Sequence, residues 1–394
     1  MKPITCPGFK AAGIHAGLKK NNEKDLGLVY SDVPATVAGV FTTNRVKAAP
    51  VQLDMERAKT GQCRAIVVNS KNANCCTGER GMQDALSMGR SVSTALDIDE
   101  NDVMVASTGV IGDPLPIEKI EAAAPDLVQS LSSQGFMDCA QAMMTTDTVP
   151  KLVHRQGELA GKPFNVVGLA KGSGMIAPNM ATMLCFLCTD VQAEPGTLKK
   201  ALFKSVETSL NRIVIDGDTS TNDTTLILAN GQSGVSLENN AGMEIFQRML
   251  DDVLMTLARE LVRDAEGGTK EVTIDVKGAA TPEDARKIAE TIANSPLVKT
   301  AIFGEDANWG RIAAAAGRAG VPLEPGQLDI FFNDVQMTAK GLNCGVKAES
   351  AATTVLKQPE YTITVDLNIG NGEASVLTCD FSIDYVKINA DYRS

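Results

Sequence analysis

Short apolar segments alternate with longer amphipathic segments along most of the chain. Apolar runs at residues 65–69 and 103–107 predict buried strands, because strands covered on both faces carry few polar positions. Between them, residues 81–96 repeat apolar side chains at helical spacing. Further helices are predicted at residues 198–210, 244–263 and 282–293. This alternation is typical of the α/β and α+β classes.

Two segments in the second half alternate apolar and polar residues strictly, at 271–277 and 361–369. This period of two places their apolar side chains on one face and predicts half-buried antiparallel strands. Residues 182–191 also form a strand-like apolar run. Thr281 followed by Pro282 is typical of the start of a helix, with the threonine as its N-cap.

Composition excludes several classes of protein. The 394 residues include 37 Lys and Arg against 48 Asp and Glu, for a net charge of −11, so nucleic-acid binding is not expected. Apolar runs such as 183–188 are too short to span a membrane. The nine cysteines, an odd number, and the absence of a signal-peptide pattern predict a cytoplasmic protein.

Histidine is scarce, which narrows the chemistry. Only His15 and His154 are present, so a histidine-rich metal site or a Ser-His-Asp triad is not expected, and no metal site is predicted. Residues 171–174 read Lys-Gly-Ser-Gly, but a Walker loop places its lysine after the second glycine. By contrast, Ser107 to Gly112 follow a predicted strand, where backbone N–H groups can point into a cleft and form an oxyanion hole.

The segment from Lys171 to Leu184, KGSGMIAPNMATML, closely resembles the self-cleavage segment of the ornithine acetyltransferase family, also called bifunctional glutamate N-acetyltransferases. The resemblance continues in chain order over essentially the whole sequence. Its other segments are residues 8–14, 38–44, 107–112, 144–148, 216–223, 266–270, 304–312 and 385–392.

This resemblance implies that the chain cuts itself between Ala181 and Thr182. The products are an alpha chain, 1–181, and a beta chain, 182–394, which need not be structural domains. The new N-terminal threonine is then the nucleophile, and its own α-amino group is the base. An α-amino pKa of about 7.7–8.0 suits that role, which accounts for the missing histidines.

The resemblance also implies the reaction, in which the acetyl group of N2-acetyl-L-ornithine passes to L-glutamate through acetyl-Thr182, a ping-pong step of cyclic arginine biosynthesis. The oxyanion hole is assigned to Thr108 and Gly109. The implied substrate contacts are Thr145, Lys171, Thr182, Glu266, Asn389 and Ser394. No cofactor is expected, although the sequence leaves open whether acetyl-CoA is a second acetyl donor.

The implied fold is an N-terminal-nucleophile-like layered α/β/β/α sandwich of the ornithine acetyltransferase and D-aminopeptidase type, with mixed sheets. Two alpha and two beta chains are expected to form a heterotetramer. An N-terminal-nucleophile aminopeptidase or amidohydrolase of related fold is the alternative enzyme. A non-catalytic amino-acid-binding protein is the alternative outside enzymes, and it would need no cleavage before Thr182.

A few positions depart from the family pattern. Lys71 stands where the family usually has glycine, and Cys75 and Cys76 stand where alanine is common. Ala307 replaces a usual proline. These departures are expected to touch neither the nucleophile nor the oxyanion segment.

Overall fold

The computed structural model describes residues 4–177, 183–237 and 240–391. Within these residues the chain forms two compact units. Unit 1 holds the described residues of 4–175, 183–211 and 218–261, and unit 2 holds those of 176–177, 212–217 and 262–391. The predicted cleavage between residues 181 and 182 lies outside the described residues, so the division into alpha and beta chains stays a prediction.

Unit 1 is built on a mixed sheet of eight strands in the order β4-β3-β2-β9-β7-β6-β5, with β1 beside β2. Its strands are β1 (Phe9–Ile14), β2 (Leu26–Phe41), β3 (Gln62–Asn69), β4 (Val103–Ser107), β5 (Lys151–Leu159), β6 (Lys162–Lys171), β7 (Leu184–Thr189) and β9 (Thr224–Ala229). Its helices are α1 (Ala49–Arg57), α2 (Gly78–Leu96), α3 (Ile117–Gln129), α4 (Phe136–Met143), α5 (Pro195–Thr208) and α6 (Asn240–Arg263).

The sheet of unit 1 folds over at its longest strand, β2. Residues 26–31 of β2 pair with β1, and residues 36–41 pair with β9. Strand β3 pairs with β2 from residue 26 to residue 36, with a register shift between Tyr30 and Ala35. Ile66 of β3 and Phe186 of β7 lie in the same buried cluster, so the two halves of the sheet face each other.

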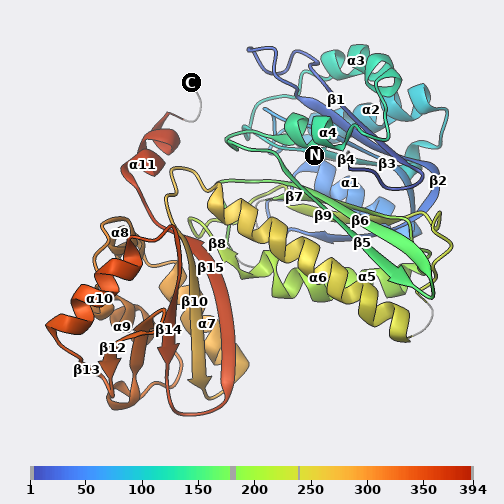
Figure 1. Ribbon diagram of the computed structural model, residues 1–394. Coiled ribbons are helices and arrows are strands. Elements are labelled where there is room, and N and C mark those ends of the chain that lie inside the picture. The colour runs from blue at the N-terminus through green and yellow to red at the C-terminus, as the bar shows by residue number, and fades with distance from the viewer. Residues whose placement is uncertain (1–3, 178–182, 238–239, 392–394) are drawn as a thin grey trace. The chain divides into compact units, whose positions relative to one another are not determined.

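Helices cover the two outer faces of this folded sheet. Met88 of α2 and Ile120 of α3 pack with Val67 of β3, whereas Phe246 of α6 meets Phe164 of β6 with ring centroids 6.4 Å apart. Figure 1 shows α2 and α3 at the top of unit 1, with α5 and α6 below. The predicted α/β/β/α sandwich with mixed sheets is therefore confirmed for unit 1.

Strand β3 shows why this layering follows from sequence. Its residues alternate between the two faces: Ile66 and Val68 enter the core between the sheet halves, while Ala65 and Val67 enter the core beneath the helices. Both faces exclude water, so both must be apolar, as the continuous run predicted. The strands predicted at 65–69 and 103–107 are confirmed.

Unit 2 contains a mixed sheet of seven strands in the order β13-β12-β11-β14-β10-β15-β8. Its strands are β8 (Ile213–Val214), β10 (Glu271–Ala279), β11 (Asp329–Phe332), β12 (Val335–Ala339), β13 (Leu342–Asn343), β14 (Glu360–Asp366) and β15 (Gly372–Cys379). Its further helices are α7 (Pro282–Ala293), α8 (Pro296–Phe303), α9 (Trp309–Gly317), α10 (Val346–Leu356) and α11 (Ile383–Ala390).

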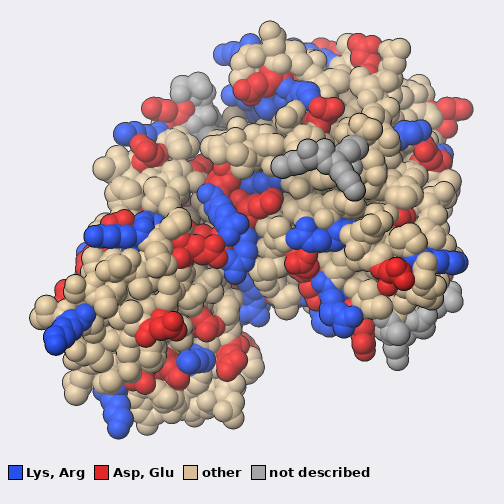
Figure 2. All heavy atoms as spheres, in the orientation of Figure 1, with Lys and Arg blue, Asp and Glu red and all other residues tan. Residues whose placement is uncertain are grey.

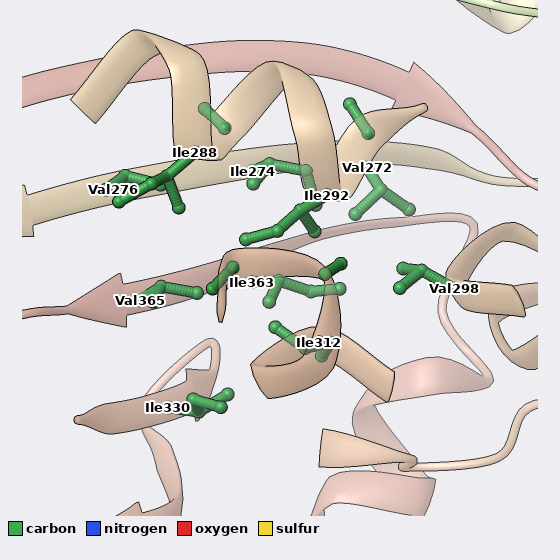
Figure 3. Close-up of a cluster of buried hydrophobic side chains, with 14 of the residues drawn as sticks. Val272, Ile274, Val276, Ile288, Ile292, Val298, Ile312, Ile330, Ile363 and Val365 are labelled. Atoms are coloured by element: carbon green, nitrogen blue, oxygen red, sulfur yellow. The ribbon is translucent and has the colours of Figure 1, made fainter. Parts of the chain in front are cut away.

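One face of the unit 2 sheet packs against helices. Figure 3 shows Ile274 of β10 beside Ile292 of α7, within one cluster of buried side chains. Thr273 and Asp275, on the other face of β10, are only half-buried, as the strict alternation predicted. The predicted cap is confirmed, since the Thr281 side chain accepts a hydrogen bond from the Asp284 N–H at 3.1 Å.

The strand prediction is incomplete in one detail and wrong in another. β10 and β14 run parallel to each other, although each also has an antiparallel neighbour, β15 and β11 respectively. The strand predicted at 361–369 ends at Asp366. Asn368 takes a φ of +54°, a left-handed conformation that extended strands do not contain.

Two observations concern the predictions about a membrane and about nucleic acid. In the described part of the chain, none of the helices combines the length and apolar character that a bilayer-spanning segment requires. Figure 2 shows basic and acidic side chains interspersed on the face that it draws. Whether nucleic acid binds is not tested by either observation and stays a prediction.

Candidate functional site

A polar cluster in unit 1 is centred on Lys171, the last residue of β6. Its Nζ donates hydrogen bonds to the Thr145 Oγ1 at 2.8 Å and to the Thr108 Oγ1 at 3.2 Å. Thr108 follows the end of β4, and Thr145 follows α4. The ends of three elements therefore meet here, and they bring together three of the predicted site residues.

The buried carboxylate of Asp147 binds several members of this cluster. It accepts hydrogen bonds from the Lys151 Nζ at 2.7 Å, the Gly172 N–H at 2.7 Å and the Thr145 N–H at 3.0 Å. The Lys171 Nζ lies 3.9 Å away, and the side chain of Asp147 is fully buried. Burial by itself would raise the pKa of Asp147, but the charges of Lys171 and Lys151 and these hydrogen bonds lower it to about 2. The carboxylate is therefore ionised and holds both lysines and both backbone segments.

A small pocket opens beside the cluster. It is lined by Thr108, Lys171, Met183, Leu184, Ser220, Asn222 and Asp223. Leu184 pairs with Lys171 in the register of β6 and β7. Met183, which directly follows Thr182 in the chain, lines the same pocket. The hydroxyl of Thr108 and the ammonium of Lys171 thus lie in a pocket formed partly by the residues that follow Thr182.

Thr108 directs its side chain, rather than its backbone, towards Lys171. Its N–H donates to the Asn69 carbonyl at 3.0 Å, so the expectation of a free backbone N–H after β4 is wrong for this residue. Gly109 has a φ of +137°. A Cβ at this position would lie 2.1 Å from the carbonyl carbon of Lys71, so only glycine fits.

The loop of residues 69–76, which we call the backing loop, runs along residues 107–112. The Val110 N–H donates to the Lys71 carbonyl at 3.1 Å, and the Gly112 N–H donates to the Cys75 carbonyl at 3.0 Å. The side chain of Asn222 joins the two segments by donating to the carbonyls of Ala73 at 2.6 Å and Ser107 at 2.8 Å. The expectation that Lys71 and Cys75 lie apart from the oxyanion segment is therefore wrong.

Two further predicted site residues lie together in unit 2. Glu266 is buried in the turn that follows α6, and its Oε2 accepts a hydrogen bond from the Asn389 Nδ2 at 2.9 Å. The Asn389 Nδ2 also donates to the Tyr385 carbonyl, one turn earlier in α11, at 3.0 Å. A Cβ on Gly267, whose φ is +67°, would lie 2.4 Å from the Tyr385 nitrogen. Glycine at 267 thus allows the turn to approach α11 closely enough for the Glu266–Asn389 bond.

Three predicted site residues lie outside the described part of the chain: Ala181, Thr182 and Ser394. Their roles in cleavage, nucleophilic attack and substrate contact stay predictions. Among the residues that the structure does describe, no group of three or more His, Cys, Asp or Glu side chains is arranged to hold a metal ion.

Sequence reasoning missed the supporting residues Asp147, Lys151 and Asn222. Asp147 belongs to the segment 144–148 and Asn222 to the segment 216–223, both of which carry the family resemblance. That resemblance was the available signal for these two residues. Lys151 begins β5 and gave no signal, because a lysine at the start of a strand is usually exposed.

Comparison with known proteins extends over nearly the whole chain. A family model described as the ArgJ family matches residues 10–394. A protein of Geobacter sulfurreducens named arginine biosynthesis bifunctional protein ArgJ is 51% identical over 389 residues, covering 98% of this chain and 99% of that protein. A protein of the same name from Desulfotalea psychrophila is 50% identical over 389 residues, with the same coverage. A solved structure of ornithine acetyltransferase complexed with ornithine, from Mycobacterium tuberculosis, is 37% identical and covers 45% of this chain and 93% of that chain, with a TM-score of 0.40.

Proposed function

Because the chain belongs to the ArgJ family, we propose that it is an acetyltransferase of arginine biosynthesis, which moves the acetyl group of N2-acetyl-L-ornithine to L-glutamate. The observation that carries this proposal is the 51% identity, over 98% of the chain, to a protein named for arginine biosynthesis. The relative from Mycobacterium tuberculosis is named ornithine acetyltransferase and was solved with ornithine. An aminopeptidase or amidohydrolase is not favoured, since relatives at this identity carry the arginine biosynthesis name.

The proposed nucleophile is Thr182, exposed as a new N-terminus by cleavage after Ala181. Its Oγ attacks the acetyl carbonyl of acetylornithine while its α-amino group takes the hydroxyl proton. The tetrahedral intermediate then collapses, the proton passes to the departing amine, and ornithine leaves. The amine of glutamate attacks acetyl-Thr182 in the second half of the cycle, which regenerates the threonine.

The hydroxyl of Thr108 is the group that we assign to the oxyanion, together with Gly109. The Thr108 Oγ1 accepts from the Lys171 Nζ, which leaves its own proton to donate to another oxygen. A hydroxyl that accepts from an ammonium is polarised and becomes a stronger donor. The charge of Lys171 therefore supports the proposed oxyanion through Thr108.

Asp147 and Lys151 keep this arrangement charged and fixed. The ionised Asp147 holds Thr145, Gly172 and both lysines. A donor whose position and charge are set before the reaction needs no reorganisation when the oxyanion forms. Asp147 is thus a positioning residue in the proposed mechanism.

The remaining proposed contacts bind the amino-acid part of the substrates. Glu266 suits a substrate ammonium, and the hydrogen bond from Asn389 orients its carboxylate. Lys171 suits an α-carboxylate, and Thr145 shares its hydrogen-bond network. Ser394 completes the set of substrate contacts that the family resemblance implies.

Three further parts of the proposal are a second reaction, the assembly of the chains and the location of the protein in the cell. The relatives' names include the word bifunctional, which supports a second reaction in which acetyl-CoA donates its acetyl group to glutamate. We also propose a heterotetramer of two alpha and two beta chains, and a cytoplasmic location. An assay of glutamate acetylation from acetyl-CoA, without acetylornithine, tests the second reaction.

Mass spectrometry of the denatured protein tests the main proposal. We expect two chains, 1–181 and 182–394, and after incubation with N-acetylornithine only the second chain should carry one added acetyl group. The variant Thr182→Ala should remain a single chain and transfer nothing. An uncut 41.6 kDa chain in active protein, or transfer by Thr182→Ala, would overturn the mechanism.

A further inference from the structure

Two adjacent cysteines, Cys75 and Cys76, end the backing loop. Their Sγ atoms lie 3.7 Å apart. Cys75 is buried, whereas Cys76 is exposed. Among the described cysteines, the only other exposed thiol is that of Cys344 in unit 2. A dissolved oxidant can therefore reach Cys76, which has a second thiol within contact distance.

We propose that Cys75 and Cys76 form a reversible oxidation site, and that a disulfide between them slows acetyl transfer by displacing the segment that carries Thr108 and Gly109. The formation of the disulfide follows from the two thiols alone. Its effect on acetyl transfer rests on the proposed function.

The oxidant is a peroxide, and the chemistry proceeds in two steps. The Cys76 thiol first loses its proton, its thiolate attacks one peroxide oxygen, and the O–O bond breaks to give a sulfenic acid on Cys76 and a hydroxide. The hydroxide takes up the proton that the thiol lost and leaves as water. The Cys75 sulfur then attacks the Cys76 sulfur, the S–O bond breaks, and a second water leaves with the Cys75 proton. Two thiols are oxidised and one hydrogen peroxide is reduced to two waters. Burial raises the pKa of Cys75, so Cys76 is the first thiol to react.

Such a bond between neighbouring residues is easily reduced. The Cα atoms of adjacent residues lie about 3.8 Å apart, which is below the usual range for a disulfide of about 4.4–6.8 Å. Strained disulfides have higher reduction potentials and serve as labile, regulatory bonds. Cys76 already has a φ of +60°, so the eight-membered ring would form at a left-handed residue whose backbone must readjust.

The backing loop transmits this readjustment to the proposed oxyanion segment. The Cys75 carbonyl accepts from the Gly112 N–H at 3.0 Å. Two residues earlier, the Ala73 N–H donates to the Val110 carbonyl at 3.0 Å. A disulfide changes the peptide between residues 75 and 76 and so moves the Cys75 carbonyl. The segment of Thr108 and Gly109 is hydrogen-bonded to that loop along its length and must shift with it.

The experiment treats the reduced full-length protein with hydrogen peroxide, alkylates the free thiols and digests the protein with trypsin. Cleavage after Lys71 and Arg80 releases residues 72–80, which contain both cysteines. We expect this peptide to be unalkylated and lighter by two hydrogen atoms, and dithiothreitol to reverse the change. Acetyl transfer should fall about tenfold on oxidation, less than complete loss of an oxyanion donor would cause, and recover on reduction.

Variants and a second measurement distinguish formation of the disulfide from its effect on acetyl transfer. Cys76→Ala should resist inactivation by peroxide, whereas Cys344→Ala should remain as sensitive as the unmodified protein. Hydrogen exchange over residues 107–112 should quicken on oxidation, and this readout needs no enzyme activity. Alkylation of both cysteines after peroxide would overturn the proposal, as would a disulfide that changes neither exchange nor transfer. Failure of the proposed function would differ, since the reduced protein would then transfer no acetyl group.

Discussion

The two groups of proposed site residues differ in how firmly the surrounding structure holds them. In unit 1, Lys171, Thr108 and Thr145 lie at the ends of packed elements, above a buried carboxylate that contacts two lysines. In unit 2, Glu266 meets Asn389 through one side-chain hydrogen bond, and Asn389 lies on α11, which has no buried residue in its described length.

This difference indicates that the unit 1 cluster suits transition-state stabilisation and the unit 2 pair suits substrate binding. Stabilising charge in a transition state requires dipoles that are fixed in advance, whereas holding a substrate tolerates local adjustment. We therefore expect changes at Thr108 and Asp147 in the unit 1 cluster to lower kcat and changes in the unit 2 pair to raise KM. Each prediction below tests this division.

The largest effect is expected from Asp147→Asn. The variant removes the charge that faces Lys171 and Lys151, and loss of one partner of a buried ion pair costs about 3–5 kcal/mol of fold stability. Because the charge that positions Lys171 beside Thr108 is then lost before the oxyanion forms, kcat should fall about a thousandfold. Self-cleavage before Thr182 should slow as well. Both rates are measured on folded protein, with thermal melting recorded in parallel.

Asp54→Asn is the matched control for this prediction. Asp54 is also a fully buried aspartate of unit 1, and it accepts a hydrogen bond from the Val105 N–H at 2.9 Å. Burial raises its pKa, and its carboxylate contacts the Val105 N–H rather than Lys171, so Asp54→Asn should leave kcat nearly unchanged. Equal kcat values for the two variants would show that the charge of Asp147 is not used.

Thr108→Val is expected to have the next largest effect. Valine keeps the shape of threonine but removes the hydroxyl that we assign to the oxyanion, and loss of one such donor lowers kcat by about 10²–10³. Thr108→Ser retains the hydroxyl and should stay within about tenfold of the unmodified enzyme. If the valine variant matched the serine variant, the side-chain assignment would be wrong and the unit 1 cluster would lose its catalytic role.

The sequence predicted the fold through local patterns. The continuous apolar run at 65–69 and the strict alternation at 271–277 report directly how many faces of a strand are covered. Partner direction has no such local signature, because it depends on how the connections cross. The antiparallel prediction therefore holds for the neighbours β15 and β11 and misses the parallel pairing of β10 with β14.

Sequence predicted the site residues that belong to recognisable motifs. It did not predict residues whose role depends on contacts between distant parts of the chain. Thr108, Thr145 and Lys171 were found through the family resemblance, and the structure places both threonine hydroxyls within hydrogen-bond distance of the Lys171 Nζ. Lys151 gave no sequence signal, because its role depends on burial beside Asp147. The contact of the backing loop with Gly109 was likewise invisible, since positions 71 and 109 are distant in the chain.

Acid should lower the free energy of unfolding of unit 1 by protonating Asp147. This effect should be smaller than those of the substitutions above. The pKa of Asp147 is about 2 in the folded protein, below the value of 3.8 expected in the unfolded chain, so its ionisation stabilises the fold above pH 4. This contribution, about 2 kcal/mol, is lost as the pH falls from about 4 to about 2. Urea unfolding measured across that range should show the loss in the unmodified protein and not in Asp147→Asn. The same acid-dependent loss in both proteins would contradict the assignment.

The smallest effect is expected from Asn389→Ala in unit 2. The variant removes one hydrogen bond to the carboxylate of Glu266, which typically contributes about 0.5–1.5 kcal/mol, so KM for acetylornithine should rise about three- to tenfold. We expect kcat to stay unchanged, because the bond orients a binding group and does not meet the oxyanion. Lys387→Ala, on the same helix and bonded only to Asp384 in the described structure, is the matched control and should alter neither constant. A large fall in kcat for Asn389→Ala, with KM unchanged, would mean that the unit 2 pair acts in the transition state, and the division of tasks between the two groups would fail.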